Sequence, residues 1–169
     1  MSKIHDMMRA GSVKRFHIVN TTRIQTLAEH QYGVAILAGE IASRLNLDTA
    51  AVASVMAAAI VHDVGECRSG DIPTPTKRRL REKLGEPFDE VLDQFDVKID
   101  KTPQVKAILK CADFLESMVF LMEHKVGRHA DVVMGDIMDD AFKYFAGCGD
   151  IGCMANRVWS DIQNAVYEI

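Results

Sequence analysis

The chain has 169 residues, 48% of them hydrophobic and 26% charged, a composition that predicts one globular domain over residues 1–169 with a sizeable core. Its formal net charge of −4 lacks the basic excess of proteins that bind nucleic acid polymers or anionic membranes. The longest apolar run is shorter than the ~20 residues of a membrane-spanning helix, and residues 1–10 lack the apolar core of a signal peptide, so we expect a cytoplasmic protein.

Apolar residues recur at helical spacing through most of the chain, and no convincing run of alternating β-branched residues interrupts them. This pattern predicts an all-α fold with almost no sheet. A loop is predicted from Ser12 to Thr26, and glycines and prolines predict an irregular loop between residues 65 and 75. In chain order, the predicted helices are Lys3–Arg9, Leu27–Asn46, Asp48–Asp63, Lys77–Lys83, Glu86–Phe95, Thr102–Glu123, Ala130–Ala146 and Asp150–Tyr167.

The sequence VHDVGE follows a long apolar segment and holds three polar side chains, His62, Asp63 and Glu66. Burying such groups without partners is costly, so we expect them to share a function. Imidazole nitrogens and carboxylate oxygens are suitable ligands for divalent first-row metals. Adjacent residues on a regular helix point ~100° apart, so His62 and Asp63 reach one ion only if the helix ends there, which Gly65 permits.

Two more polar residues lie within apolar helical stretches, His30 in LAEH and Asp113 in LKCAD. Each has a structural interpretation when taken alone, because His30 fits a hydrogen-bonded core histidine and Asp113 fits a carboxylate paired with Lys110. Together with the HD pair at 62 and 63, however, they complete a set of four metal ligands. The sequence therefore predicts a buried metal site formed by His30, His62, Asp63 and Asp113.

The order of these residues resembles the H…HD…D signature of the HD-domain phosphohydrolases. Five ordered segments, RFHI, RIQTLAEH, VHDVGE, GDIPTPTK and LKCAD, make the chain similar to the YfbR-like 5'-deoxynucleotidases in that superfamily. The short chain and Ile18 resemble the phage branch, the dATP triphosphohydrolases of viruses that replace adenine by 2-aminoadenine. The resemblance implies a single HD-domain helical bundle that assembles as a homo-oligomer, either a dimer or a hexamer.

The resemblance also implies a divalent metal cofactor, and cobalt, zinc, manganese or magnesium fits the predicted ligands. A second magnesium or cobalt ion with the triphosphate is consistent with it. Glu66 lies four residues after His62, so in helical geometry it shares that face and is a candidate for deprotonating the attacking water; a surface glutamate is the alternative. Arg15 is the second catalytic candidate, because its guanidinium can neutralise a phosphoryl group.

Substrate-binding residues are expected in the matching segments. Lys110 lies one helical step before Asp113, and Lys77 follows the proline loop, where it can reach the outer phosphates. By resemblance, Phe16 stacks on the base and Ile18 and Pro75 form walls, although core packing explains Ile18 equally well. The complete expected set is Arg15, Phe16, Ile18, Asp71, Thr74, Pro75, Lys77 and Lys110.

The function expected from the resemblance is hydrolysis of a small-molecule deoxynucleotide, dATP above all, to deoxyadenosine and triphosphate, with dADP and dAMP as further substrates. One alternative is a broad 5'-deoxynucleotidase acting on dNMPs, which uses the same metal chemistry. Another is a non-catalytic HD module that binds a nucleotide. The presence of all four ligands and Glu66 argues against the non-catalytic alternative.

Overall fold

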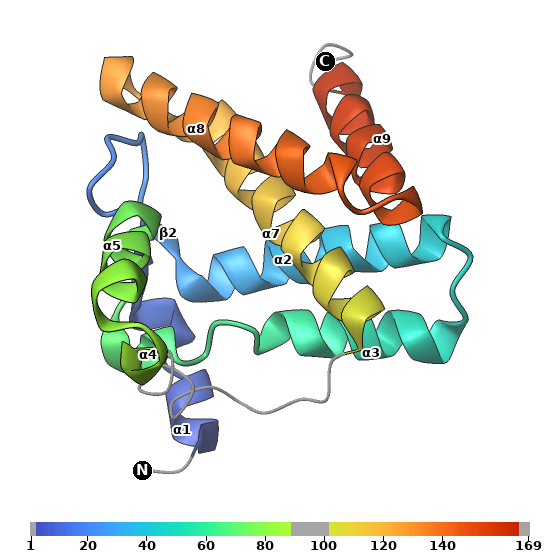
Figure 1. Ribbon diagram of the computed structural model, residues 1–169, viewed down its shortest axis with the longest axis horizontal. Helices are drawn as coiled ribbons and strands as arrows, with labels where there is room; N and C mark the ends of the chain where they lie inside the picture. The colour runs from blue at the N-terminus through green and yellow to red at the C-terminus, as the bar shows by residue number, and fades with distance from the viewer. Residues whose placement is uncertain (1–2, 89–101, 166–169) are drawn as a thin grey trace.

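A computed structural model describes residues 3–88 and 102–165, and it is almost entirely helical (Figure 1). This confirms the predicted all-α fold. The main helices are α1 (Lys3–Met7), α2 (Leu27–Arg44), α3 (Thr49–Ile60), α4 (Glu66–Ser69), α5 (Thr74–Leu84), α7 (Pro103–His124), α8 (Gly127–Ala146) and α9 (Asp150–Ala165). A 3-10 turn covers Ala10–Ser12. Most of the helix predicted at Glu86–Phe95 lies outside the described residues.

Helices α2 and α3 form an antiparallel pair (Figure 1). A capping box starts α2, in which the Thr26 hydroxyl accepts from the Glu29 amide and the Glu29 carboxylate accepts from the Thr26 amide. Small residues let the two helices approach closely, and a Cβ at Gly39 would lie 2.9 Å from the sulfur of Met56 on α3. The antiparallel arrangement therefore places the first turn of α2 beside the residues that follow α3.

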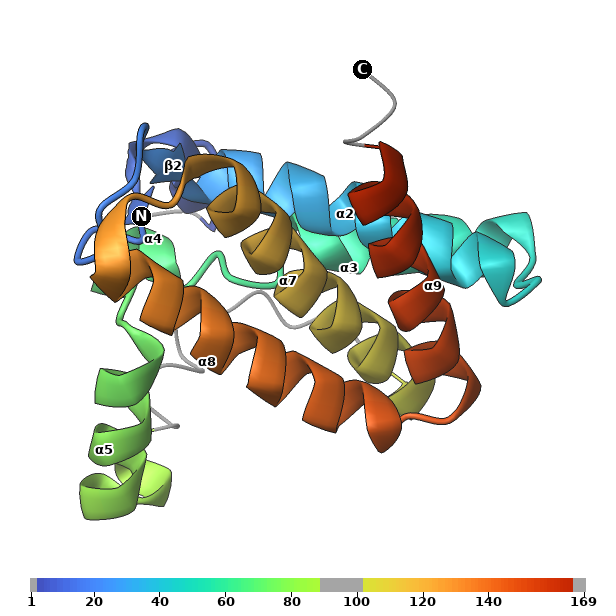
Figure 2. The same ribbon diagram turned by 90° about the horizontal axis from the view of Figure 1, so that it is seen from above.

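Helix α7 crosses the α2–α3 pair, and α8 returns antiparallel to α7 (Figures 1 and 2). The centre of α7 is buried, with Ile108, Leu115, Met118 and Leu121 each fully inaccessible to solvent. Burial of such side chains contributes roughly 1.5–3 kcal/mol each. The core thus fixes the middle of α7 against α2. None of the described helices is long and apolar enough to cross a membrane.

Helix α3 ends at Ile60, three residues before the predicted end at Asp63. Irregular turns follow, and α4 then begins at Glu66. The prediction that Gly65 permits the helix end was wrong, because Gly65 has ordinary right-handed dihedral angles (φ −53°, ψ −32°) and precedes α4. The earlier ending frees His62 and Asp63 from helical geometry, which is the condition that their adjacent positions required.

The predicted loop before α2 contains a small antiparallel ladder of β1 (Lys14–Arg15) and β2 (Gln25–Thr26). In this ladder Arg15 pairs with Gln25. The residues between the strands are tied to the connection after α7, because the Thr22 amide donates to the His124 carbonyl and the Val126 amide donates to Asn20. The ladder and these bonds hold the segment in place although it lacks a helix.

Helix α5 stands at one end of the molecule, away from α9 (Figures 1 and 2). Its eleven residues, TPTKRRLREKL, include five basic ones, and none of the eleven is buried. A proline at its start, Pro75, has the fixed φ that suits the first turn. The helix starts three residues earlier than the predicted Lys77.

Candidate metal centre

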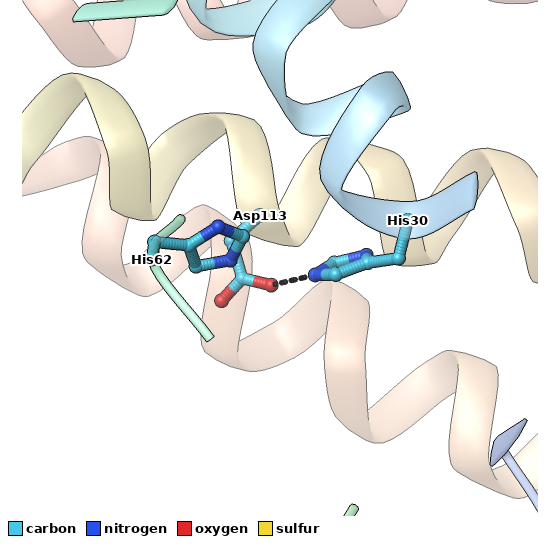
Figure 3. Close-up of side chains that lie close together, drawn as sticks. All are labelled: His30, His62 and Asp113. Atoms are coloured by element: carbon cyan, nitrogen blue, oxygen red, sulfur yellow. Dashed lines mark ion pairs between the residues drawn. The ribbon is translucent and has the colours of Figure 1, made fainter. Parts of the chain in front are cut away.

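His30, His62 and Asp113 converge from three separate parts of the chain (Figure 3). His30 lies in the first turn of α2, His62 in the turn after α3, and Asp113 in the middle of α7. One ligand atom from each lies within 4.8 Å of the others, and His30 Nε2 is 3.4 Å from Asp113 Oδ1. Two imidazoles and a carboxylate make a donor set suited to a divalent transition metal.

Hydrogen bonds select the ring nitrogen that each histidine offers. His62 Nδ1 donates to the Ala59 carbonyl oxygen at 2.6 Å, and His30 Nδ1 lies 2.5 Å from Glu116 Oε2. The Nε2 atoms of both rings are buried without a hydrogen-bond partner in the described part of the chain. Buried polar atoms without partners are costly. Two orphaned nitrogens beside a carboxylate are the arrangement that a metal ion would satisfy, so the residues fit the expected cofactor.

Asp63 lies next to this group but outside its compact three-residue set. Its Oδ2 atom is 3.2 Å from His62 Nε2 and 3.7 Å from His30 Nε2, and it also lies 3.5 Å from Arg15 Nη1. The structure therefore brings all four predicted ligands together. The Asp63 carboxylate is shared between the histidines and Arg15, and its role as fourth ligand stays a prediction.

Glu66 and Arg15 lie beside the metal centre. Arg15 Nη1 is 3.7 Å from Glu66 Oε2, and Lys77 Nζ donates to Glu66 Oε1 at 2.8 Å. The alternative of a surface glutamate does not hold, because Glu66 is only 6% exposed. Burial, together with the nearby charge of Asp63, raises the pKa of Glu66 to about 7. A carboxyl group with such a pKa can exchange a proton near neutral pH.

The carboxylates around His30 and His62 raise the pKa values of both imidazoles. Burial opposes the charge on His30, but the carboxylates of Asp113 and Glu116 outweigh burial and raise its pKa to about 9. The pKa of His62 is also raised, since the attraction of Asp63 outweighs burial and the repulsion of His30. In turn, the pKa of Asp113 is held below its usual range, because Lys110 and His30 overcome the effect of burial.

We expect metal binding to release protons and to strengthen as the pH rises. A metal ion needs the unprotonated Nε2 of His30, and with a pKa of about 9 that atom is protonated at neutral pH. Below pH 9, each displaced proton weakens apparent affinity by about tenfold per pH unit, and above pH 9 this effect ends. Titration calorimetry in buffers of different protonation enthalpy measures the released protons. Equal heats in all buffers would contradict the expectation.

The predicted phosphate-binding lysines pair with the acidic residues of the site. Lys110 Nζ donates to Asp113 Oδ2 at 2.8 Å and lies 4.4 Å from the centre of the Phe114 ring. Lys77 Nζ donates to Glu66, so each of the two cations is paired with a carboxylate of the site. Both lysines therefore lie beside carboxylates of the site, and their binding of phosphate stays a prediction. The pairing of Asp113 with Lys110, offered as the structural alternative, occurs in the same geometry.

Of the residues expected to bind the base, Phe16 lines a hollow in the structure and Ile18 does not. Phe16 adopts a left-handed backbone (φ 51°) and stacks on Phe120 with ring centres 5.4 Å apart. A hollow of about 540 Å³ beside it is lined by Phe16, Asn20, Ile24 and their neighbours. Ile18 is 58% exposed, so core packing does not explain it. It does not line this hollow either.

The remaining expected residues, Asp71, Thr74 and Pro75, follow α4. Asp71 is half-buried, and its Oδ2 atom is 3.9 Å from His17 Nδ1, whereas Thr74 and Pro75 are exposed at the start of α5. The structure does not place them against the metal ligands. Their contacts with a sugar or base stay predictions.

Two buried residues of the site escaped the sequence analysis, Glu116 and Gln25. Glu116 bonds to His30, and Gln25 Nε2 donates to Glu116 Oε1 at 2.6 Å. A signal existed for Glu116, which lies three residues after Asp113 and therefore on the same face of the predicted helix. Gln25 lies in a segment predicted to be a loop, and although it belongs to the matching RIQTLAEH segment, nothing in the sequence assigned it a role.

Comparison with known proteins fits this geometry. Residues 4–94 match the family described as 5'-deoxynucleotidase YfbR-like. The chain belongs to the YfbR-like family. A dATP triphosphohydrolase of Salmonella phage PMBT28 is 39% identical over an alignment of 140 positions, and the match covers 75% of this chain and 69% of the phage protein. A dATP triphosphohydrolase of Acinetobacter phage SH-Ab 15497 is 32% identical over an alignment of 167 positions, and the match covers 87% of this chain and 81% of the phage protein.

A solved structure is also similar, the HD phosphohydrolase DatZ of cyanophage S-2L, bound to dA and one catalytic Zn²⁺ ion. It has a TM-score of 0.78 and 25% identity, and the match covers 96% of each chain. The likeness extends over nearly the whole length, beyond the residues 4–94 of the family match. This YfbR-like chain therefore has the fold of an HD phosphohydrolase, as the sequence predicted.

Proposed function

We propose that the protein is a metal-dependent phosphohydrolase that cleaves dATP to deoxyadenosine and triphosphate. The observation that carries the proposal is the convergence of His30, His62 and Asp113, with two unpartnered buried nitrogens, in a chain similar to phage dATP triphosphohydrolases. Zinc is the first ion to test, because the similar structure of DatZ holds one. Depletion of dATP is the resulting biological effect.

In the proposed reaction, water attacks the α-phosphorus and the bond between this phosphorus and O5' breaks. Deoxyadenosine leaves with O5' protonated as its 5'-hydroxyl group, and the three phosphates leave as triphosphate. A bound divalent ion supplies Lewis-acid stabilisation and lowers the pKa of water. Glu66 is buried beside the ligands and takes the proton of the attacking water, which its pKa of about 7 allows. Arg15, which lies beside Asp63 and Glu66, neutralises the charge that develops on the phosphoryl oxygens.

Lys77 supports a polyphosphate substrate. Its ammonium group is held at the site by Glu66, on a helix with four other basic residues and no buried one. A substrate with three phosphates offers this group a more highly charged partner than a monophosphate does. The arriving phosphates would draw Lys77 away from Glu66 and free that carboxylate to act as a base.

Removing the charge of Lys77 is expected to affect triphosphate more than monophosphate. For Lys77→Met, kcat/KM for dATP should fall by about tenfold or more, as for loss of one hydrogen bond to a charged group, while the value for dAMP changes less. Lys83→Met, on the same helix and exposed, is the matched control. Equal losses for dATP and dAMP would remove the outer-phosphate role of Lys77.

The products distinguish the proposed activity from the second candidate, a 5'-deoxynucleotidase acting on dNMPs, which the family description favours. Zinc-loaded protein is incubated separately with dATP, dGTP, dAMP and ATP, and the phosphate products are separated by chromatography. Triphosphate from dATP, with little from dGTP or ATP, is the expected result. Orthophosphate from dAMP without cleavage of dATP would establish the second candidate, and no turnover of any substrate would favour a non-catalytic HD module.

Three wider expectations accompany this proposal: a single cytoplasmic domain, a homo-oligomer, and a phage whose DNA contains 2-aminoadenine. We also propose that Ile18 selects adenine, because its apolar side chain, if it faces C2 of the purine, would disfavour the 2-amino group of guanine. Its exposed side chain is available to a ligand or to a second copy of the chain. Replacing Ile18 by alanine should relax the preference for dATP over dGTP, and an unchanged preference would remove the role.

A further inference from the structure

Glu116 lies behind the metal ligand His30, on the side opposite the offered Nε2 atom. It is 8% exposed, and both of its carboxylate oxygens have partners, His30 Nδ1 at 2.5 Å and Gln25 Nε2 at 2.6 Å. A carboxylate that only accepts requires the ring proton to reside on Nδ1 of His30. That tautomer leaves the lone pair of Nε2 directed at the metal centre.

Gly33 shows that the chain makes room for this carboxylate. A Cβ atom at Gly33 would lie 2.7 Å from Glu116 Cγ and 3.2 Å from Glu116 Oε1. Gly33 lies inside α2, where glycine costs about 1 kcal/mol relative to alanine, and it has no positive φ that would otherwise demand glycine. Close approach of Glu116 therefore explains the glycine at this position.

Gln25 extends the network toward the substrate side. It is 2% exposed and lies in β2, where it pairs across the ladder with Arg15. Arg15 in turn lies 3.5 Å from Asp63 and 3.7 Å from Glu66. One short ladder thus connects the residue that orients Glu116 with the residue expected to contact phosphate.

We propose that Glu116 is a positioning residue that fixes the tautomer and orientation of His30 for metal binding, with Gln25 orienting Glu116 and Gly33 providing its space. The negative charge also increases the basicity of the His30 ring. The inference rests on the proposed metal-dependent function. It concerns affinity for the ion, so it is tested without any substrate.

The test measures zinc affinity by competition with a coloured chelator. Glu116→Gln is expected to weaken zinc binding by about 10- to 100-fold, the usual effect of removing such a partner. Glu123→Gln, an isosteric change at an exposed position of the same helix, is the matched control and should remain within about twofold of wild type. Zinc affinity of Glu116→Gln within that same range would overturn the proposal, as would a wild-type protein that binds no zinc.

Gly33→Ala provides a second test that keeps every polar group. The added methyl group must displace Glu116, so zinc affinity should fall in the same direction, whereas Gly39→Ala on the same helix meets the side chain of Met56 and not Glu116. Nitrogen NMR of labelled histidine should show protonated Nδ1 of zinc-bound His30 in wild type and a changed signal in Gly33→Ala. Unchanged affinity and an unchanged signal would contradict the positioning role, even if dATP hydrolysis fails.

Discussion

Glu66→Gln is expected to lose nearly all dATP hydrolysis while keeping its metal ion. The substitution removes the proton-accepting group but retains its size, and general-base catalysis contributes about 10²- to 10⁴-fold to rate. Glu66 lies outside the convergent set of His30, His62 and Asp113, so zinc content should stay the same. Measured kcat and bound zinc per chain, taken from one preparation, test both statements.

The melting temperature of Glu66→Gln shows whether the loss of activity is caused by unfolding. The pKa of Glu66 in the folded metal-free protein is about 7, above the usual value of about 4.5, because burial and the charge of Asp63 oppose its ionisation. Stability is therefore lost as the pH rises from about 4.5 to about 7, and it stays lower above that range. Glu66→Gln avoids this cost, so its melting temperature at pH 8 should not fall below that of wild type.

The exposed Glu82→Gln on α5 is the control for loss of a glutamate in this region, and it should leave kcat unchanged. A Glu66→Gln protein that hydrolyses dATP at the wild-type rate would remove Glu66 from the mechanism. A variant that loses zinc together with activity would instead make Glu66 part of the metal centre.

His62→Ala is expected to lose the ion and the activity together. His62 Nε2 faces the centre, and alanine removes the whole imidazole ring, so no atom of the new side chain can replace the lost ligand. Removal of a direct ligand should weaken zinc binding by more than the 10- to 100-fold that is typical when a residue hydrogen-bonded to a ligand is removed. Chelator competition and the rate of dATP cleavage are measured on the same samples.

The fold of the variant should survive, because His62 lies in a turn after α3 and outside the main core. His129→Ala, at an exposed position on α8, provides the matched control. Activity of His62→Ala that returns at high zinc concentration would support a role in affinity alone. Wild-type zinc affinity in His62→Ala would show that the ion binds elsewhere.

Local sequence patterns predicted most of the helices, because the long helices bury apolar residues and because α2, α3 and α7 begin with side-chain caps that can be read in the sequence. Thr102 accepts from the Val105 amide at the start of α7, and Asp48 accepts from the Ala51 amide at the start of α3. His30 and Asp113 stood out for a related reason, since polar residues in apolar stretches need buried partners. Together with the HD pair at 62 and 63, these two residues were enough to predict one metal site.

Tertiary contacts determined the features that the sequence did not predict. The end of α3 at Ile60 depends on turns that have no glycine at a positive φ and no proline. The pairing of Arg15 with Gln25 is a short ladder with too few residues to show a period of two. Glu116 looked like an ordinary helical glutamate, and only the approach of α2 places it against His30.

Helix α5 is expected to open more readily than the other long helices, because none of its residues is buried against the rest of the protein. Isolated helices shorter than about 12–15 residues are marginal in water, and α5 has eleven residues with none buried. Its backbone amides should therefore exchange with deuterium sooner than those of α2, whose inner face is buried. A nucleotide that binds Lys77 would slow this exchange, so α5 can report occupancy of the site by mass spectrometry without any measurement of turnover.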